Sequence, residues 1–283
     1  MALSVNTNVT SLMVQKNLNS AATNVSNSMQ RLSSGLRINS AADDAAGMQI
    51  STRMTSQIRG QTVAIKNAND GISLAQTADG AMATDTDILQ RMRELAVQAR
   101  NGTNSTADQT ATNAEFAQMS DELTRIANST QVNGKNLLDG SAGIVTLQVG
   151  SNTGSSNQIS LTLSGKFDAV SLSVGSGTVV LTGATSAAAA SNIDNAITAI
   201  DAAIASINST RASLGASQNR LTSTISVLQN VTQNVTAAQG RIQDTDFAAE
   251  TAQLTKQQTL QQASTSVLAQ ANQLPSSVLK LLQ

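Results

Sequence analysis

A regular alternation of four-residue and three-residue steps joins the apolar positions between Ile193 and Val235. Ten of its thirteen positions are Ile, Leu or Val. Such spacing is typical of the seam of a coiled coil, and one helix of this length spans about 65 Å. We therefore predict a long rod with partner helices along it. The positions are Ile193, Ile197, Ile200, Ile204, Ile207, Arg211, Leu214, Gln218, Leu221, Ile225, Leu228, Thr232 and Val235.

A second seam of the same kind runs from Ala64 to Ala99. Small residues dominate its first half, so a neighbouring helix is expected to approach closely there. The segment NGTNST (101–106) breaks it, and Phe116 opens a shorter third helix. The seam positions are Ala64, Ala68, Gly71, Ala75, Ala78, Met82, Asp85, Leu89, Met92, Ala96 and Ala99.

The two chain ends resemble each other in pattern and in lack of charge. Only Lys16 is charged in the first thirty residues, and no residue is charged between Lys256 and Lys280. We predict that the ends pair as helices and that their remaining surface packs against other copies, although an ordinary hairpin within a monomer fits the same pattern. The predicted seams comprise Leu18, Ala22, Val25, Met29, Leu32 and Leu36, and Leu260, Ala263, Val267, Ala271, Leu274, Val278 and Leu281.

Two charged segments, 33–60 and 237–250, join these ends to the middle of the chain. Glycines at 35, 47 and 60 favour a bent connection in the first segment rather than a continuous helix. Asp43 and Asp44 stand without other acidic residues nearby, so capping or salt bridging is a better interpretation than metal binding. Pro275 is expected to end or kink the last helix, or to start a short final turn.

The pattern changes between Gly134 and Gly183, where nine of the 17 glycines lie and apolar residues alternate. This favours a small antiparallel β element with SNTGSSN (151–157) as its first turn. Its strands are predicted around 145–149, 159–163, 170–174 and 178–182. The Ser/Thr-rich stretch 175–190 is interpreted as a surface loop.

Composition removes several classes of function. The chain has three Phe but no Trp, Tyr, His or Cys, and a formal net charge of -1. The charge balance gives no footprint for nucleic acid or anionic membrane, and the missing His and Cys remove the commonest catalytic and metal-binding groups. We therefore expect no enzyme, cofactor or metal site. The N-terminus lacks the pattern of a secretory signal peptide, and no apolar stretch is long enough to span a membrane.

Several long motifs in order resemble the bacterial flagellins: RLSSGLRINSAADDAAGMQI (31–50), LQRMRELAVQARNGTNS (89–105), LGASQNRLTSTI (214–225), AAQGRIQDTDFAAETAQL (237–254) and ANQLPSSVLKLLQ (271–283). Departures are small, such as Met48, Gln49, Val132 and Gly240. The family's variable outer domains are missing, and a few residues near 175–190 stand in their place.

The resemblance implies a mainly α fold, a coiled-coil-like helical rod built from the N- and C-terminal halves with a small antiparallel β-hairpin in the middle. The terminal helices (1–42 and 243–283) would form the inner tube of a filament. The rod (43–174 and 191–242) would form the outer tube, with 175–190 as a short variable loop.

The same resemblance implies an extracellular subunit of the flagellar filament, exported by the flagellar type III apparatus without a cleaved signal. Its partners would be copies of itself, an export chaperone at the C-terminal region, the filament cap, hook-filament junction proteins and a Toll-like immune receptor. The receptor positions are Arg91, Leu95 and Glu115, and ordinary ion pairing and packing are their alternative roles. The residues predicted to carry self-assembly are Leu18, Val25, Met29, Leu32, Leu36, Leu260, Val267, Leu274, Val278 and Leu281.

Two other interpretations remain at this point. A hook-filament junction protein would share the terminal patterns but occur in few copies. A coiled-coil scaffold or signalling module would form a stable dimer and no filament.

Overall fold

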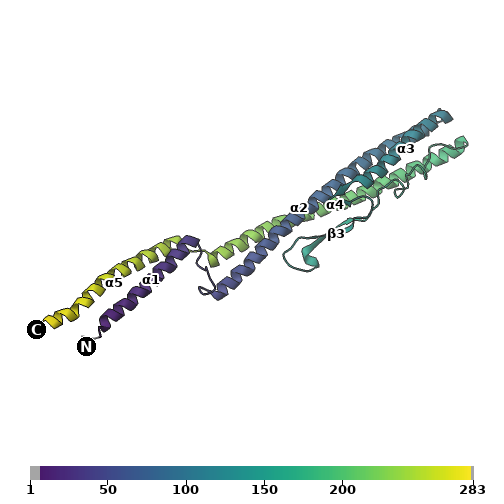
Figure 1. Cartoon of the computed structure of the whole chain (residues 1–283). Coiled ribbons are helices and arrows are strands. Elements are labelled where there is room, and N and C mark those ends of the chain that lie inside the picture. The colour runs from purple at the N-terminus through teal and green to yellow at the C-terminus, as the bar shows by residue number, and fades with distance from the viewer. Residues whose placement is uncertain (1–6, 282–283) are drawn as a thin grey trace. The chain divides into compact units, whose positions relative to one another are not determined.

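The computed structural model describes residues 7–281, with side chains for 7–273, and consists mainly of long helices (Figure 1). This confirms the predicted fold class, a helical rod-forming chain with a β-hairpin between its two halves. The elements are α1 (Val9–Ser34), α2 (Ala45–Ala99), α3 (Thr106–Ser129), β1 (Gln131–Val132), β2 (Lys135–Asn136), β3 (Gly143–Gln148), the 3-10 helix η1 (Ser155–Asn157), β4 (Gln158–Leu163), α4 (Ser186–Gln243) and α5 (Phe247–Leu281).

The chain divides into two compact units. Unit 1 comprises Met1–Ile58 and Gln233–Gln283, and unit 2 comprises Arg59–Thr232. Helices α2 and α4 each contribute one part to unit 1 and another to unit 2.

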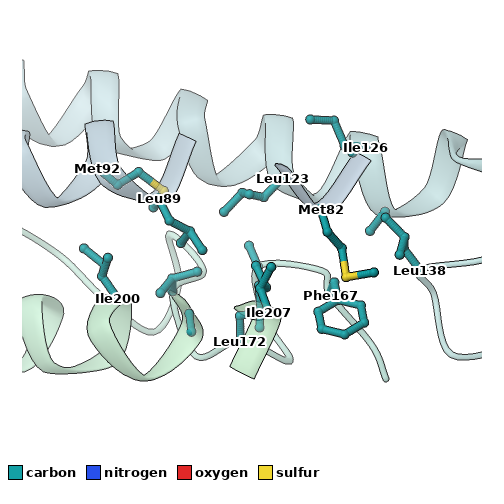
Figure 2. Packing of buried hydrophobic residues seen from close by; sticks show 14 of the residues in the cluster. Met82, Leu89, Met92, Leu123, Ile126, Leu138, Phe167, Leu172, Ile200 and Ile207 are labelled. Carbon is teal, nitrogen blue, oxygen red and sulfur yellow. The ribbon is translucent and has the colours of Figure 1, made fainter. Parts of the chain in front are cut away.

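The core of unit 2 follows the two predicted seams. On α4, every seventh residue from Ile193 to Leu228 is at most 9% exposed, and none of the thirteen predicted positions is exposed. All eleven predicted positions of α2 are buried. Figure 2 shows how Met82 and Leu89 of α2 lie in one cluster with Leu123 of α3 and Ile207 of α4. Both seams are confirmed.

Side-chain pairs along unit 2 show that α2 and α4 run antiparallel. The Gln61 amide oxygen accepts from the Thr232 hydroxyl at 2.9 Å, and Arg211 pairs with Asp79 at 2.8 Å. Further along, Arg93 pairs with Asp201 and Arg100 with Asp194, both at 2.8 Å. Because exposed pairs of this kind contribute at most about 1 kcal/mol each, we attribute the alignment mainly to the buried seam.

Helix α3 begins earlier than predicted, at Thr106, because Ser105 caps it. The Ser105 side chain accepts from the Asp108 backbone N–H, and the Asp108 carboxylate accepts from that of Ser105. This reciprocal capping box is encoded by the local sequence S-x-x-D. Beyond α3, Asn133 and Gly134 have φ of 50° and 74° and close the two-residue turn between β1 and β2, a hairpin that the sequence analysis missed.

The predicted β-hairpin is confirmed as the pair β3 and β4, with Gly143 opposite Leu163 and Gln148 opposite Gln158. It lies on the small residues of α2. A Cβ atom on Gly71 would come within 2.1 Å of Leu147 Cδ1, and one on Gly60 within 2.9 Å of Ser151 Cβ. The Asn67 side-chain amide also donates to the Gln148 carbonyl at 3.0 Å. The small residues in the first half of the α2 seam therefore accommodate the hairpin as well as α4.

The prediction of two further strands at 170–174 and 178–182 is wrong. Residues 164–185 form turns and irregular backbone that lie along α3. The Thr124, Ser120 and Asn113 side chains accept from the backbone N–H groups of Ala169, Ser176 and Leu181 at 3.4, 3.2 and 2.7 Å. Alternating apolar residues here bury themselves against helices instead of pairing with a strand. The buried ones are Phe167, Ala169, Leu172, Val174, Val179 and Leu181.

The predicted bent connections are shorter than expected. Helix α2 already begins at Ala45 and α4 continues to Gln243, so only 35–44 and 244–246 lie outside helices. Gly47 lies within α2 and does not break it. Glycine is required there for space, because an added Cβ would lie 2.6 Å from Ile38 Cδ1. Helix α5 likewise continues past Pro275. In the described part of the chain, no helix combines the length and hydropathy that a bilayer span requires.

Replacing Gly71 with Val tests the seat of the hairpin. The new side chain collides with Leu147 and Leu221, so we expect a loss of about 1–3 kcal/mol in the free energy of unfolding. Gly80 is the matched control, since a Cβ there meets nothing within 4 Å. Gly80→Val should change stability by less than about 0.5 kcal/mol. Equal urea midpoints for the two variants would contradict this packing.

Candidate assembly surface

Helices α1 and α5 lie side by side in unit 1 and share a seam of small and polar residues (Figure 1). The fully buried members are Ala21, Ser28, Gln257 and Ala271. The half-buried ones repeat every three or four residues around them. They are Ser11, Val14, Leu18, Val25 and Leu32 on α1, and Glu250, Leu254, Gln261, Ser264 and Leu268 on α5. The pair thus buries few large apolar side chains.

Further large apolar side chains of the pair lie on its outside. Their exposed fractions are 62% for Val9, 58% for Leu12, 64% for Met13, 55% for Met29, 45% for Leu260 and 46% for Val267. An exposed apolar surface of this kind is typical of a face that binds another protein surface. We call this set of six residues the outer face of unit 1.

Part of this seam lies one position away from the residues predicted to form it. Met29, Leu260 and Val267 were assigned to the contact between the two helices, as were Ala22 and Ala263, but all five are exposed. Leu18, Val25 and Leu32 do line the seam, and Leu36 is half-buried just beyond α1. The buried neighbours of Ala22 and Met29 are Ala21 and Ser28, which a search for large apolar residues passes over. Leu274, Val278 and Leu281 lie outside the described side chains.

Polar contacts hold the two helices in register at both ends of the pair. The Asn8 amide donates to the Ala271 carbonyl at 2.7 Å, and the Ser11 hydroxyl donates to Asn272 Oδ1 at 2.8 Å. At the other end, Arg31 lies 3.8 Å from Glu250. These contacts have directional geometry, so they fix which residues of α1 and α5 face each other.

The two bends of unit 1 are hydrogen-bonded to each other through their backbones. The Arg37 N–H donates to the Gln243 carbonyl at 2.7 Å, and the Thr245 N–H donates to the Gly35 carbonyl at 3.0 Å. Gly35 has φ of 72°, the left-handed conformation that ends α1. The bends, although 200 residues apart in sequence, therefore form one joint.

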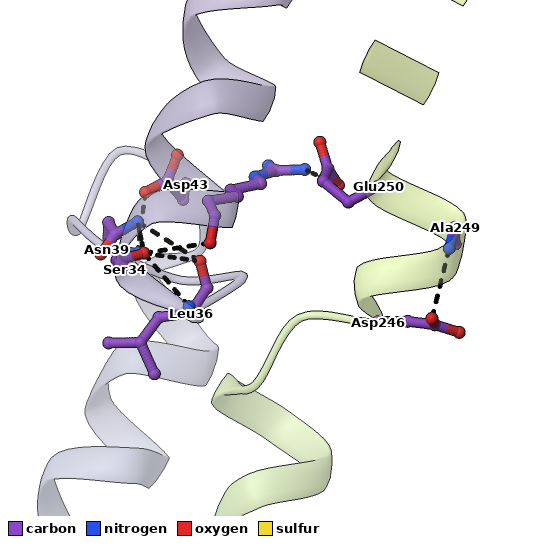
Figure 3. Close-up of polar contacts among 8 residues, drawn as sticks. Ser34, Leu36, Asn39, Asp43, Asp246, Ala249 and Glu250 are labelled. Atoms are coloured by element: carbon purple, nitrogen blue, oxygen red, sulfur yellow. Dashed lines mark hydrogen bonds and ion pairs between the residues drawn. The ribbon is translucent and has the colours of Figure 1, made fainter. Parts of the chain in front are cut away.

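Aspartates shape this joint (Figure 3). Asp43 accepts from the backbone N–H and hydroxyl of Ser40 and from the N–H of Asn39, and these bonds hold the pKa of its carboxyl below the ordinary value. Asp44 accepts from the Gly47 N–H at the start of α2, and Asp246 from those of Ala248 and Ala249 in α5. The predicted capping role is confirmed for Asp44, whereas Asp43 closes the turn that precedes α2.

A buried polar network continues from the joint between α2 and α4. The Ser51 hydroxyl donates to Gln243 Oε1 at 2.6 Å, and the Gln239 amide donates to the Thr55 hydroxyl at 2.7 Å. Ser51 is 4% exposed. Such groups are satisfied only in one alignment of the helices, so they specify register at some cost in apolar burial.

The three positions assigned to an immune receptor differ in accessibility. Arg91 and Glu115 are exposed and pair at 2.9 Å, and Arg91 also reaches Glu94 at 3.0 Å. The Glu115 hydrogen bond, with that of Glu94, raises the pKa of Arg91 above its ordinary value. Leu95 is 1% exposed and belongs to the core cluster. Arg91 and Glu115 thus present charge on the surface, whereas Leu95 packs inside.

No catalytic constellation accompanies this surface. Within residues 7–281 no three acidic side chains converge as metal ligands would, and the sequence contains no His or Cys that could complete such a set. Long paired helices with an exposed apolar face are typical of a structural protein that binds other protein surfaces.

Comparison with known proteins gives the family. The bacterial flagellin N-terminal helical region matches residues 5–143, and the bacterial flagellin C-terminal helical region matches residues 197–282. The chain therefore belongs to the bacterial flagellin family. It is a structural subunit of the flagellar filament and not an enzyme, and members of the family polymerise with copies of themselves.

Relatives that match over their full length support the same family. The chain is 40% identical to flagellin B of Vibrio cholerae and 38% identical to polar flagellin C of Vibrio parahaemolyticus, with 100% of each chain covered. The first alignment has 382 positions against 283 residues here, so at least 99 positions have no counterpart in this chain.

One solved structure shares the fold. It comes from Vibrio parahaemolyticus, is described as a flagellar hook-associated protein, and is 14% identical with a TM-score of 0.58. The match covers 71% of this chain and 100% of that one. At this identity the likeness shows the fold alone, and it does not favour the hook-filament junction alternative.

Proposed function

We propose that this flagellin polymerises through the outer face of unit 1, with α1 and α5 forming the inner part of the filament. The observation that carries the proposal is the inversion of the pair: Ser28 and Gln257 are buried while Met29 and Leu260 are about half exposed. A pair that evolved to be covered on one side only would bury the larger side chains within itself.

The energetics favour a large assembly. Fully burying one Leu, Val or Met side chain contributes about 1.5–3 kcal/mol, so covering the remaining half of one contributes about 1 kcal/mol. The outer face holds six such residues. A contact that repeats without closing on itself produces a helical polymer, in which every internal subunit has this face covered.

Folding of the ends is coupled to polymerisation in this proposal. The α1 and α5 seam buries mostly Ala, Ser and Gln, which contributes little to the stability of a two-helix pair alone. Chains whose terminal helices are only marginally stable can pass unfolded through a narrow export channel and become ordered in the filament. We infer export by the flagellar type III apparatus on the same grounds.

The proposed division of labour follows the joint at 35–44 and 244–246. Residues 1–42 and 243–283 build the inner tube, and 43–174 with 191–242 build the outer tube. Residues 175–190 mark the site where relatives carry outer domains, because neither flagellin region matches residues 144–196.

Partners beyond the chain itself belong to the same proposal. An export chaperone binds the C-terminal region, where Leu260 and Val267 offer exposed apolar contacts before assembly. The filament cap and the hook-filament junction proteins contact the ends of the polymer. A Toll-like receptor contacts the exposed surface of Arg91 and Glu115, with Leu95 supporting it from the core.

The double variant Met29→Gln with Leu260→Gln tests the assembly face. Each change removes about 1 kcal/mol of burial, so the critical concentration for seeded polymerisation should rise at least about tenfold. Sedimentation and electron microscopy measure it. Val227→Gln is the control, because Val227 is 59% exposed but lies in unit 2. Polymerisation of the double variant at the unaltered critical concentration would refute the outer face.

Amide exchange tests the coupling of order to assembly. In the monomer, residues 9–34 and 247–273 should exchange much faster than the buried positions of α2, since few large side chains hold them. In the filament they should be protected. Strong protection of both segments in the monomer would show that they fold without partners.

Receptor signalling tests the exposed arginine. Arg91→Ala should lower the signalling potency of the monomer by roughly tenfold or more, because the loss of a charged contact weakens receptor binding. Arg93→Ala is the matched control, because Arg93 is also exposed and ion-paired, with Asp201. Equal responses to both variants would count against Arg91.

A further inference from the structure

The seam of α2 contains one ionisable side chain, that of Asp85, at a position where its neighbours are apolar. Asp85 is 0% exposed, and so are Met82 and Leu89, three residues before it and four after it on the same helix face. Neither carboxyl oxygen of Asp85 has a hydrogen-bond partner within the described residues. The adjacent Thr86 hydroxyl donates to the Met82 carbonyl at 2.8 Å and so is engaged elsewhere.

The neighbours of Asp85 on its helix face belong to the apolar core. Met82 and Leu89 pack in the cluster with Leu123 from α3 and Ile207 from α4 (Figure 2). An ionised carboxylate in such a place loses its hydration without compensation, whereas the neutral acid loses much less. Burial accordingly raises the pKa of Asp85 to about 7.

The charged groups on the elements around this stretch are engaged with one another or exposed. Asp79 pairs with Arg211, Arg93 with Asp201, and Glu122 with Arg125. Over the residues that the structure describes, no cation lies within ion-pair distance of Asp85. Every other charged residue of α2, α3, α4 and residues 164–185 is at least partly exposed, including Asp87 on α2, Asp121 on α3, and Lys166 and Asp168 on the segment that follows β4.

We propose that Asp85 is a pH-sensitive point in unit 2: the bundle holds its carboxyl as the neutral acid, and loss of that proton loosens the packing of α2 against α3 and α4. The rod of this flagellin is then tighter in mildly acidic surroundings and weaker above neutrality. The residue sits in the helical bundle and not in the outer face, so the proposal stands apart from the assembly contacts.

The sign follows from linkage. In an unfolded chain the carboxyl of Asp85 has its ordinary pKa of 3.8, whereas the folded chain raises this pKa to about 7 and so keeps the proton to about that pH. Between these values folding retains a proton, so stability falls as pH rises, and the loss is complete above pH 7. With no His or Cys in the chain, the side chains that ordinarily titrate between pH 5 and 8 are absent.

Thermal unfolding of the full-length monomer at several pH values from 5 to 8 tests the proposal. The unfolding midpoint of the natural chain should fall on the order of 5 °C more across this range than that of Asp85→Asn. Asp85→Leu, which fills the site with an apolar side chain, should show the same weak dependence of the unfolding midpoint on pH as Asp85→Asn. An infrared band of a protonated carboxyl near pH 6 should be lost in Asp85→Asn.

Asp87→Asn is the matched control, because Asp87 is an exposed aspartate two residues along the same helix. It should keep the pH dependence of the natural chain. Parallel profiles for the natural chain, Asp85→Asn and Asp85→Leu would overturn the proposal, and so would a protonated-carboxyl band that persists in Asp85→Asn.

Discussion

The antiparallel contact between α2 and α4 is the interaction on which the rest of unit 2 depends. Apolar residues at four- and three-residue steps on both helices meet in one narrow core, and no Trp or Tyr is needed to fill it. This core aligns the exposed ion pairs and gives α3 and the β-hairpin a surface to pack on. Asp85 interrupts it at one place, where a carboxyl takes an apolar position.

Unit 1 follows a different principle. Its network of Ser51, Thr55, Gln239 and Gln243 is polar, and the α1 and α5 seam mixes buried Ala, Ser and Gln with half-buried Val and Leu, so hydrogen bonds contribute to the alignment beside apolar burial. Polar seams specify register but contribute little net stability. Further apolar side chains, such as those of Met29 and Leu260, lie outside the pair, where the proposed filament contacts would cover them.

The hairpin and the segment that follows β4 show how small side chains decide what packs where. Gly60 and Gly71 leave room on α2 for Ser151 and Leu147, and α3 presents Asn113, Ser120 and Thr124 to the backbone of the following segment. The two glycines leave space for a neighbouring side chain that a bulkier residue would exclude, and the three polar side chains accept hydrogen bonds from a neighbouring backbone. The two flagellin regions match on either side of this part of unit 2, at residues 5–143 and 197–282.

The sequence by itself determined the long helices and the seams of α2 and α4, because a repeat of 3.5 residues leaves little freedom over forty residues. It also determined the β3–β4 hairpin, through alternating apolar residues, and the family, through several long motifs in order. Tertiary structure decided the phase of α1 and α5, since Ser28 and Met29 are adjacent and only packing selects which one is covered. It also decided that the apolar alternation at 170–182 lies on helices and not in a sheet, because alternation specifies a buried side but not the partner. The isolation of Asp85 was equally beyond the sequence: a seam position predicts burial, but only the surrounding side chains show that no donor reaches the carboxyl.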